Sequence, residues 1–552
     1  MPVSKKIHYE KKDFLFFFIS FSLFLLSCED ALDIVQDGEL NDEALFTSVQ
    51  NMQFFLNETY DQLTIQNEIM LSSTLTDEVA VGSAGFPSET LSFNVFSTNG
   101  FAINIWSSNY RAINYANRLI RGSQLFTPPT TDLPAYNNII AQARAIRAFC
   151  HFNLLTYFST NLADPNAPGV MLVDFVPTTA QKIPRSTNAQ VFSLIESDLL
   201  FAENNLTTPT SGGNSWRFFN VNVINAMRAR MYLYRGLHTQ AETYADLVIN
   251  NSGIQLASCT FTLPTDFPLT SNSTTHIGAS GSDSFDTQPP AGPQRALFLM
   301  DRWTATAFSP DYRKMWVDFS QGEAIFSLLR LNNNANFGSQ YNTNQSYIGG
   351  GPLRDMGRNL YELFTQPMGG GAQDFRRWSF VDRSSLIVPD ATQGDQFNDV
   401  LIVDKYPGKA GNHGSNDLKV FRMSEMYFIK AECRIAAGDT PGAAALIRTV
   451  RQNRNYIASA VVPLPTYANP TAAWADVLLE RRKELCFEGH RYIDLKRIGT
   501  LAGVTTTDRF LTDSQNSSAI NPLNISVTDF RLTLPIPQDE INVNPMAQNP
   551  GY

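Results

Sequence analysis

Apolar residues recur at steps of three or four along residues 139–158, and this spacing constrains the fold more than any other feature of the sequence. The positions are Ile139, Ala143, Ile146, Cys150, Leu154 and Phe158. Such spacing places apolar side chains on one face of an α-helix. Similar spacing predicts helices over residues 106–119, 191–201 and 473–488, and residues 186–188 (Ser-Thr-Asn) can cap the second of these. We therefore expect a mainly helical chain.

Two further segments predict helical hairpins with the same internal spacing. Residues 221–250 contain Ala229-x6-Gly236-x4-Ala241, and residues 423–453 contain Ala431-x6-Gly438-x4-Ala443. Small residues at these positions let paired helices approach closely. The pattern resembles the tetratricopeptide hairpin, although the two copies lie about 200 residues apart and do not form a tandem array.

Long segments between the helices are rich in small and polar residues. Residues 251–295, 332–352 and 381–415 predict loops, and loops of this length in a compact protein usually carry function. The tail over residues 531–552 contains four prolines, so it is predicted to be extended and not helical.

The amino terminus has the composition of an export signal. Lysines over residues 5–12 precede the apolar or small residues 14–26, a run shorter than the ~20 residues that a membrane-spanning helix needs. Leu25-Leu26-Ser27-Cys28 resembles the bacterial lipobox, which implies cleavage after residue 27 and lipidation of Cys28. The acidic residues that follow Cys28 resemble the surface-export signal of Bacteroidetes lipoproteins. An ordinary signal peptide with a chance cysteine is the alternative.

Charge and motif content exclude several classes of protein. A net charge of −10 without a basic run disfavours nucleic-acid binding. The histidines are scattered without metal-ligand spacing, and no nucleotide-binding or nucleophile motif occurs, so no cofactor is expected. Calcium binding through loop carboxylates stays open. The four remaining cysteines are expected to be buried thiols, with a Cys433–Cys486 disulfide as the less favoured alternative.

Glu480, Glu484 and Glu488 form the most enzyme-like feature, because a spacing of four places their carboxylates on one helix face. Paired carboxylates can perform acid–base catalysis. Basic residues surround them, however, at Arg481, Arg482, Lys483 and Arg491. The favoured interpretation is a network of ion pairs that joins helices.

Several segments together resemble the SusD/RagB family of surface lipoproteins of Bacteroidetes. They are the lipobox and residues 143–149, 421–432, 480–497, 534–541 and 548–552. The resemblance implies a mainly α fold, an α–α superhelix of tetratricopeptide-like hairpins with long loop-rich insertions. Its regions would be a signal peptide over 1–27, an amino-terminal region over 28–220, a middle hairpin with loops over 221–330, and a carboxy-terminal region over 331–552, all in one compact unit.

The resemblance also implies a function. The protein would be anchored to the outer membrane by lipid and exposed at the cell surface. It would bind an oligosaccharide or polysaccharide and deliver it to a SusC-like TonB-dependent transporter, without acting as an enzyme. A peptide-binding uptake lipoprotein of the same architecture is the alternative, and a glycoside hydrolase is a less favoured one.

Sugar rings pack on flat aromatic side chains, and their hydroxyl groups pair with polar ones. Trp106 and Trp474 lie in helical patterns and are expected in the core. In the family, ligand residues tend to follow an early Asp and to come from the middle of the chain. The predicted ligand-binding residues are therefore Asp77, Phe86, Trp303, Tyr341 and Tyr347.

Overall fold

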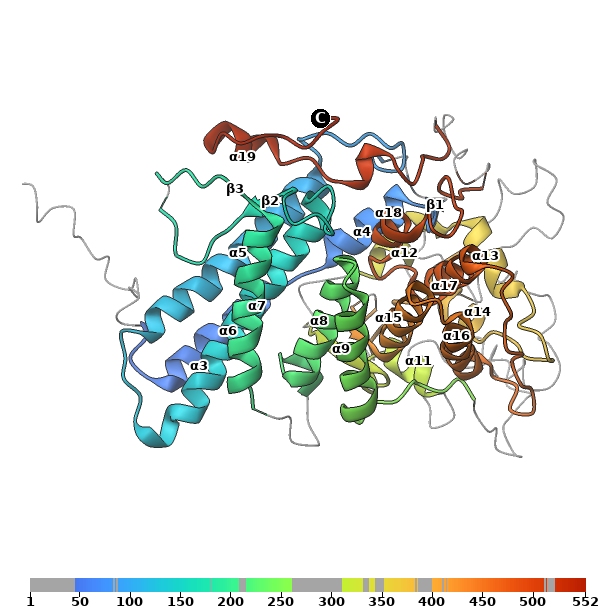
Figure 1. The fold of residues 1–552 in the computed structure, drawn as a ribbon, viewed down its shortest axis with the longest axis horizontal. Coiled ribbons are helices and arrows are strands. Elements are labelled where there is room, and N and C mark those ends of the chain that lie inside the picture. The colour runs from blue at the N-terminus through green and yellow to red at the C-terminus, as the bar shows by residue number, and fades with distance from the viewer. Residues whose placement is uncertain are drawn as a thin grey trace, which may run out of the picture.

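The computed structural model describes residues 45–82, 85, 88–178, 180–207, 215–260, 310–330, 337–342, 352–382, 385, 400–409, 412–413, 415–510, 513 and 522–552. This part of the chain is mainly helical, as the sequence predicts. In Figure 1 the helices over residues 49–61, 100–123, 133–158 and 188–205 lie on one side of the molecule and those over residues 221–251 lie in the middle. The helices over residues 423–498 lie on the other side, where the helix over residues 66–75 is next to that over residues 491–498.

Five helices form the described amino-terminal region; the last three contain the predicted helices over residues 106–119, 139–158 and 191–201, and the first two were not predicted. The five are α3 (Val49–Asp61), α4 (Gln66–Leu75), α5 (Gly100–Ser123), α6 (Leu133–Phe158) and α7 (Asn188–Asn205). Helix α7 begins at a reciprocal cap, where the Thr187 side chain accepts from the Gln190 backbone and the Gln190 side chain accepts from the Thr187 backbone. The predicted cap before residue 191 is thereby confirmed.

The two predicted hairpins are present and lie against each other. One consists of α8 (Val221–Tyr234) and α9 (His238–Asn251), and the other of α15 (Met423–Ala436) and α16 (Thr440–Arg454). Gly236 and Gly438 occupy the turns at φ +72° and +83°, in the left-handed region that favours glycine. Helix α9 packs on α15, so hairpins distant in the sequence stack side by side.

Further helices of the carboxy-terminal half, together with 3-10 turns and strand pairs from both halves, complete the described fold. The helices are α11 (Asp311–Trp316), α12 (Ser339–Asn342), α13 (Arg358–Thr365), α14 (Arg376–Phe380), α17 (Pro470–Leu485) and α18 (Arg491–Ile498), and the 3-10 turns are η1 (Thr130–Asp132), η2 (Ser215–Arg217) and η6 (Phe530–Leu532). Antiparallel strand pairs join β1 (Val79–Val81) to β5 (Arg354–Met356), β2 (Pro168–Met171) to β3 (Arg185–Thr187), β4 (Ala324–Leu328) to β8 (Leu418–Arg422), and β6 (Gly408–Lys409) to β7 (Asn412–His413).

The carboxy-terminal tail departs from the prediction, because it contains α19 (Gln538–Val543) between its prolines. Pro537 precedes the first helical residue, where its missing N–H costs no intrahelical hydrogen bond. The negative charges of Asp539 and Glu540 lie in the first turn and stabilise the helix through its positive amino-terminal end. The tail lies across the amino-terminal helices (Figure 1). There Leu534 N donates to Tyr157 O at 2.9 Å, and Trp106 Nε1 donates to Glu540 Oε2 at 2.9 Å.

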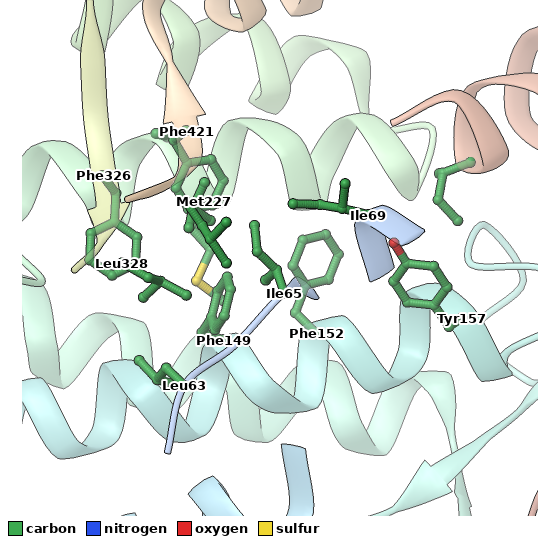
Figure 2. Close-up of a cluster of buried hydrophobic side chains, with 14 of the residues drawn as sticks. Leu63, Ile65, Ile69, Phe149, Phe152, Tyr157, Met227, Phe326, Leu328 and Phe421 are labelled. Atoms are coloured by element: carbon green, nitrogen blue, oxygen red, sulfur yellow. The ribbon is translucent and has the colours of Figure 1, made fainter. Parts of the chain in front are cut away.

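The hydrophobic core is shared by segments from the whole chain. Figure 2 shows Phe149, Phe152 and Tyr157 of α6 facing Ile65 and Ile69, with side chains of α8, β4 and β8 closing the cluster. Cys150, Cys259, Cys433 and Cys486 are buried free thiols, so the alternative of a Cys433–Cys486 disulfide is wrong. Within the described ranges, no helix combines the length and apolarity needed to cross a membrane.

Candidate functional site

Four segments lie close together in a region that we call the loop corner: residues 77–82, 353–358, 401–404 and 508–510 with Asp513. Pairing of β1 with β5 brings Gly82 N within 3.1 Å of Leu353 O. Met356 N donates to Leu401 O at 2.8 Å, and Arg358 N donates to the Asp513 carboxylate. Backbone contacts therefore fix the described ends of several long connections close together.

Asp77 is the electrostatic anchor of the loop corner. Its buried carboxylate accepts from Arg491 Nε at 2.8 Å and Nη2 at 2.7 Å, and from Asp508 N at 2.9 Å. Burial alone would raise the pKa of Asp77, but the guanidinium groups of Arg482 and Arg491 outweigh it and hold the pKa well below its usual value. Asp77 is thus ionised and joins the start of β1 to the carboxy-terminal helices.

Glu78, the next residue, belongs to a separate hydrogen-bonded chain that ends at Tyr341. Glu78 Oε1 accepts from Phe487 N at 3.0 Å, and Ser73 Oγ lies 3.1 Å from Glu78 Oε2 and 3.0 Å from Tyr341 Oη. Tyr341 is fully buried. Burial raises the pKa of Glu78 to about 7, because it outweighs the hydrogen bond from Phe487 N and the weaker effect of the Arg491 charge, and the neighbouring Asp77 carboxylate adds to the rise.

The structure describes two of the five predicted ligand-binding residues, Asp77 and Tyr341. Asp77 and Tyr341 lie under the loop corner and bond to protein groups, which makes them supports of its base. Phe86, Trp303 and Tyr347, like the lipidation residue Cys28, lie outside the described residues. A role for any of the five predicted residues in ligand binding stays a prediction.

Tryptophan exposure separates core residues from candidate binding residues. Trp106 and Trp474 are buried, as predicted, and Trp316 is fully buried. Trp216 and Trp378 are the described tryptophans that are only partly buried, and Trp378 also packs against the hydrophobic core. The sequence analysis singled out neither, because half-burial of a short loop or helix leaves no periodic signal.

Trp378 lies next to the loop corner. It belongs to α14, whose last residue Phe380 accepts through its carbonyl from Asp404 N at 2.7 Å, and Asp382 N donates to Ile402 O at 2.8 Å. The Arg377 guanidinium lies 5.2 Å from the centre of the Trp378 ring. A flat ring beside a cationic donor can pack against a sugar face and pair with its hydroxyl groups.

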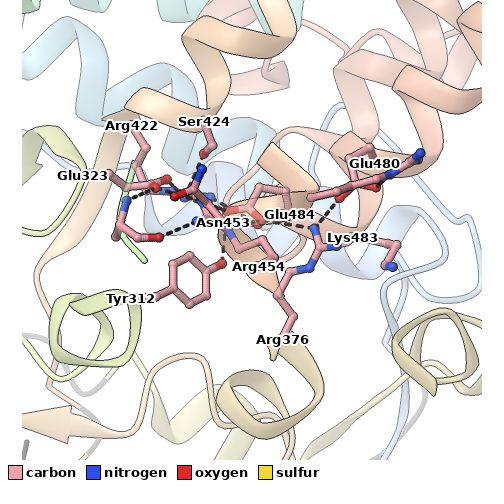
Figure 3. Close-up of polar contacts among 12 residues, drawn as sticks. Tyr312, Glu323, Arg376, Arg422, Ser424, Asn453, Arg454, Glu480, Lys483 and Glu484 are labelled. Atoms are coloured by element: carbon pink, nitrogen blue, oxygen red, sulfur yellow. Dashed lines mark hydrogen bonds and ion pairs between the residues drawn. The ribbon is translucent and has the colours of Figure 1, made fainter. Parts of the chain in front are cut away.

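Glu484 is at the centre of the predicted ion-pair network, which Figure 3 shows. Its carboxylate accepts from Arg454 Nε at 2.9 Å, Arg422 Nη1 at 2.9 Å and Arg376 Nη1 at 3.1 Å, and from the Tyr312 hydroxyl at 3.0 Å. Burial alone would raise the pKa of Glu484, but the three arginines outweigh it and hold the pKa well below its usual value.

The two flanking glutamates are neutralised in the same way. Glu480 forms ion pairs with Arg376 and Arg451, each at 2.7 Å. Glu488 pairs with Arg422 at 2.7 Å and with Lys405 at 2.6 Å. All three carboxylates are buried against cations, so none is available as a general acid, base or nucleophile. This burial against cations disfavours the glycoside hydrolase alternative at these three residues. Among the described residues, no three His, Cys, Asp or Glu side chains are grouped to hold a metal ion.

Two family models match the chain. One, described as the SusD family, matches residues 397–552, and the other, described as starch-binding associating with outer membrane, matches residues 30–233. The chain is 24% identical over 568 residues to SusD-like protein P2 of Formosa agariphila, with 97% of this chain and 99% of that protein covered.

Solved structures match over most of the chain. A SusD superfamily protein from Bacteroides thetaiotaomicron is 22% identical with a TM-score of 0.66, and the match covers 91% of this chain and 100% of that one. A SusD-like carbohydrate binding protein from Bacteroides vulgatus is 17% identical with a TM-score of 0.58, and the match covers 84% of this chain and 85% of that one. A laminarin binding SusD-like protein is 19% identical with a TM-score of 0.57, covering 92% and 100%. At these identities the likeness shows the fold.

Proposed function

Because this chain belongs to the SusD family, we propose that it binds an oligosaccharide or polysaccharide at the cell surface and delivers it to a SusC-like TonB-dependent transporter. Lipid on Cys28 would anchor it to the outer membrane, and the transporter would be its partner. The mechanism is binding and transfer without covalent chemistry.

The observation that carries the proposal is the match of both family models, one of them described as starch-binding, to a chain with the same fold as carbohydrate-binding relatives. The ion pairs of the Glu480 helix support a binding role and not a hydrolytic one, since its carboxylates are neutralised inside the fold.

We place the glycan site at the loop corner. The supporting geometry is a base held by the buried contacts of Asp77 and Tyr341, with the partly buried ring of Trp378 beside it. A base fixed by buried ion pairs loses little conformational entropy when a ligand binds. Phe86, Trp303 and Tyr347 are proposed to add further aromatic and polar contacts.

The test is a binding screen of the protein without residues 1–28 against polysaccharides and oligopeptides, by affinity electrophoresis and calorimetry. We expect retardation by a glycan, and a loss of affinity of at least about tenfold in Trp303→Ala and in Trp378→Ala, equal to about 1.4 kcal/mol. The matched control is Trp216→Ala, which removes a half-buried tryptophan outside the loop corner and should leave affinity unchanged.

The screen also separates the alternatives. Binding of oligopeptides alone would replace the glycan by a peptide ligand in the same architecture. Glycan binding that survives both Trp303→Ala and Trp378→Ala would keep the ligand class and contradict the position of the site.

A further inference from the structure

A small cavity, partly open to solvent, lies between helices α4, α6 and α8 and the segment over residues 488–493. Its volume is about 40 Å³, and it is lined by residues of α4 and α6 on one side, α8 on another, and residues 488–493 on a third. Figure 2 shows part of its apolar wall, formed by Ile65, Phe149 and Phe152. The lining thus includes residues from both regions that the family models match, residues 30–233 and residues 397–552.

The size of the cavity restricts its occupant. Sites for small organic ligands have volumes of roughly 300 Å³ or more, so a sugar ring does not fit. A water molecule needs about 10–15 Å³ of such space, so the cavity can hold about three. Water is therefore the ligand class that its volume allows.

Two buried polar atoms of the lining residues lack a protein partner. Glu68 Oε1 accepts from Asn109 Nδ2 at 3.3 Å, but Glu68 Oε2 finds no hydrogen-bond partner within the described part of the chain. The same is true of Asn153 Nδ2. An unpaired buried polar atom costs about 1–3 kcal/mol, and buried water is the usual remedy. Since both residues line the cavity, water inside it can reach them after small side-chain adjustments.

We propose that this cavity is a hydration site, in which a cluster of ordered water molecules bridges Glu68 on α4 to Asn153 on α6. The cluster would add water-mediated bonds between α4 and α6, beside the direct hydrogen bond from Tyr492 N to Ser72 Oγ that joins the segment over residues 488–493 to α4.

The neighbouring charges fit an uncharged ligand. Arg230 is neutralised by Glu425 at 2.6 Å, and Glu488 by Arg422 and Lys405. Burial and the nearby arginines, Arg230 first among them, hold the pKa of His490 well below its usual value, so its ring is neutral. Tyr157 and Tyr234 also line the cavity, and burial raises the pKa of both hydroxyl groups, so they are neutral too.

Glu68 itself alternates between two states near neutral pH, because burial raises its pKa to about 7. A carboxylate needs a donor at Oε2, whereas a carboxylic acid needs an acceptor. Water can reorient to serve as either, and a fixed protein group cannot.

The test is a high-resolution crystal structure of the protein without residues 1–28. We expect density for water within hydrogen-bonding distance of Glu68 Oε2 and Asn153 Nδ2. Glu68→Gln keeps a polar group of the same shape, so the water should remain. Glu68→Met removes the polar group, so the electron-density peak for the water next to residue 68 should disappear. An empty cavity in the parent protein would overturn the proposal whether or not the variants fold, and so would an unchanged peak in Glu68→Met. In solution, oxygen-17 relaxation dispersion should count fewer long-lived waters in Glu68→Met than in Glu68→Gln.

Discussion

Arg491 donates two hydrogen bonds to Asp77, at 2.8 Å to Oδ1 and 2.7 Å to Oδ2, and the two residues are 414 positions apart in the sequence. A bidentate guanidinium–carboxylate pair fixes both position and orientation. The start of β1, and with it the loop corner, is therefore held in place by the carboxy-terminal helices.

Asp77→Asn is expected to destabilise the protein by about 3 kcal/mol, because it leaves the Arg491 guanidinium buried without its counter-charge. Thermal unfolding measures the effect. Asp508→Asn is the matched control, since the Asp508 side chain is 54% exposed and its pair with Arg482 should contribute less than about 1 kcal/mol. Equal losses in the two variants would contradict the anchoring role of Asp77.

Glu484→Gln should destabilise the protein by about 3–5 kcal/mol, because three arginines then share a buried site without its central carboxylate. Urea unfolding is the measurement. Glu362→Gln breaks a pair with Arg358 in which the glutamate is 43% exposed, so it should cost no more than about 0.5 kcal/mol. A Glu484→Gln protein as stable as its parent would show that the network contributes no net stability.

Stability should fall as the pH rises from about 5 to about 7 and level off above, since two buried glutamates keep protons that the unfolded chain releases. Burial raises the pKa of Glu68 and of Glu78 from 4.5 to about 7. Each contributes stability that is complete below pH 4.5 and is lost as the pH rises to 7, by up to about 1.4 kcal/mol per pH unit. Urea unfolding across this range should show a shallower slope in Glu78→Gln than in the parent.

At acid pH the sign reverses, and Glu480 illustrates why. Burial alone would raise its pKa, but Arg376 and Arg451 outweigh it and lower the pKa from 4.5 to about 2. Its stabilising pairs are complete above pH 4.5 and are lost as the pH falls towards 2. Stability that stayed constant between about pH 4 and about pH 2 would contradict this assignment.

Gly438→Ala should destabilise the second hairpin by about 1–2 kcal/mol, because an L-residue is forced into the left-handed region. An added Cβ would meet no atom within 4 Å, so the cost is one of backbone conformation alone. Gly100→Ala is the control, because Gly100 begins α5 in equally open space without a positive φ. It should stabilise the protein slightly, and calorimetric unfolding of both variants checks the difference.

Cys28→Ser in the full-length chain is expected to move the protein from the outer-membrane fraction to the soluble fraction, because the acyl chains would have no attachment point. Cell fractionation with immunoblotting is the measurement. Ser27→Ala is the control, since it keeps a small residue before the cysteine and should leave the protein in the membrane. Membrane association that survives Cys28→Ser would contradict the lipid anchor.

Local sequence patterns predicted the long helices α5, α6 and α7 and the two hairpins, because each depends on residues a few positions apart, whereas α3 and α4 were not predicted. The spacing of Ile146, Cys150 and Leu154 identifies α6, and Thr187 identifies the start of α7. The four prolines of the tail predict an extended segment without a helix. Pro537, however, stands just before the first turn of α19, where proline is tolerated.

The candidate site was less predictable, because its geometry depends on contacts between distant residues. The stripe at Glu480, Glu484 and Glu488 predicts an ion-pair network, but nothing local indicates Arg376 or Arg422 as partners. Likewise, no pattern distinguishes the buried Trp316 from the partly buried Trp378, since burial is decided by which other segments fold over each ring.

The tail that crosses the amino-terminal helices also bears on the order of folding. Tyr157 O and Phe158 O accept hydrogen bonds from Leu534 N and Asn549 Nδ2, each at 2.9 Å, and the Trp106 indole donates to Glu540. A chain that emerges amino terminus first exposes these groups long before their partners arrive. Early folding intermediates should therefore expose an incomplete surface on α5 and α6, and the last contacts to form should be those of greatest sequence separation.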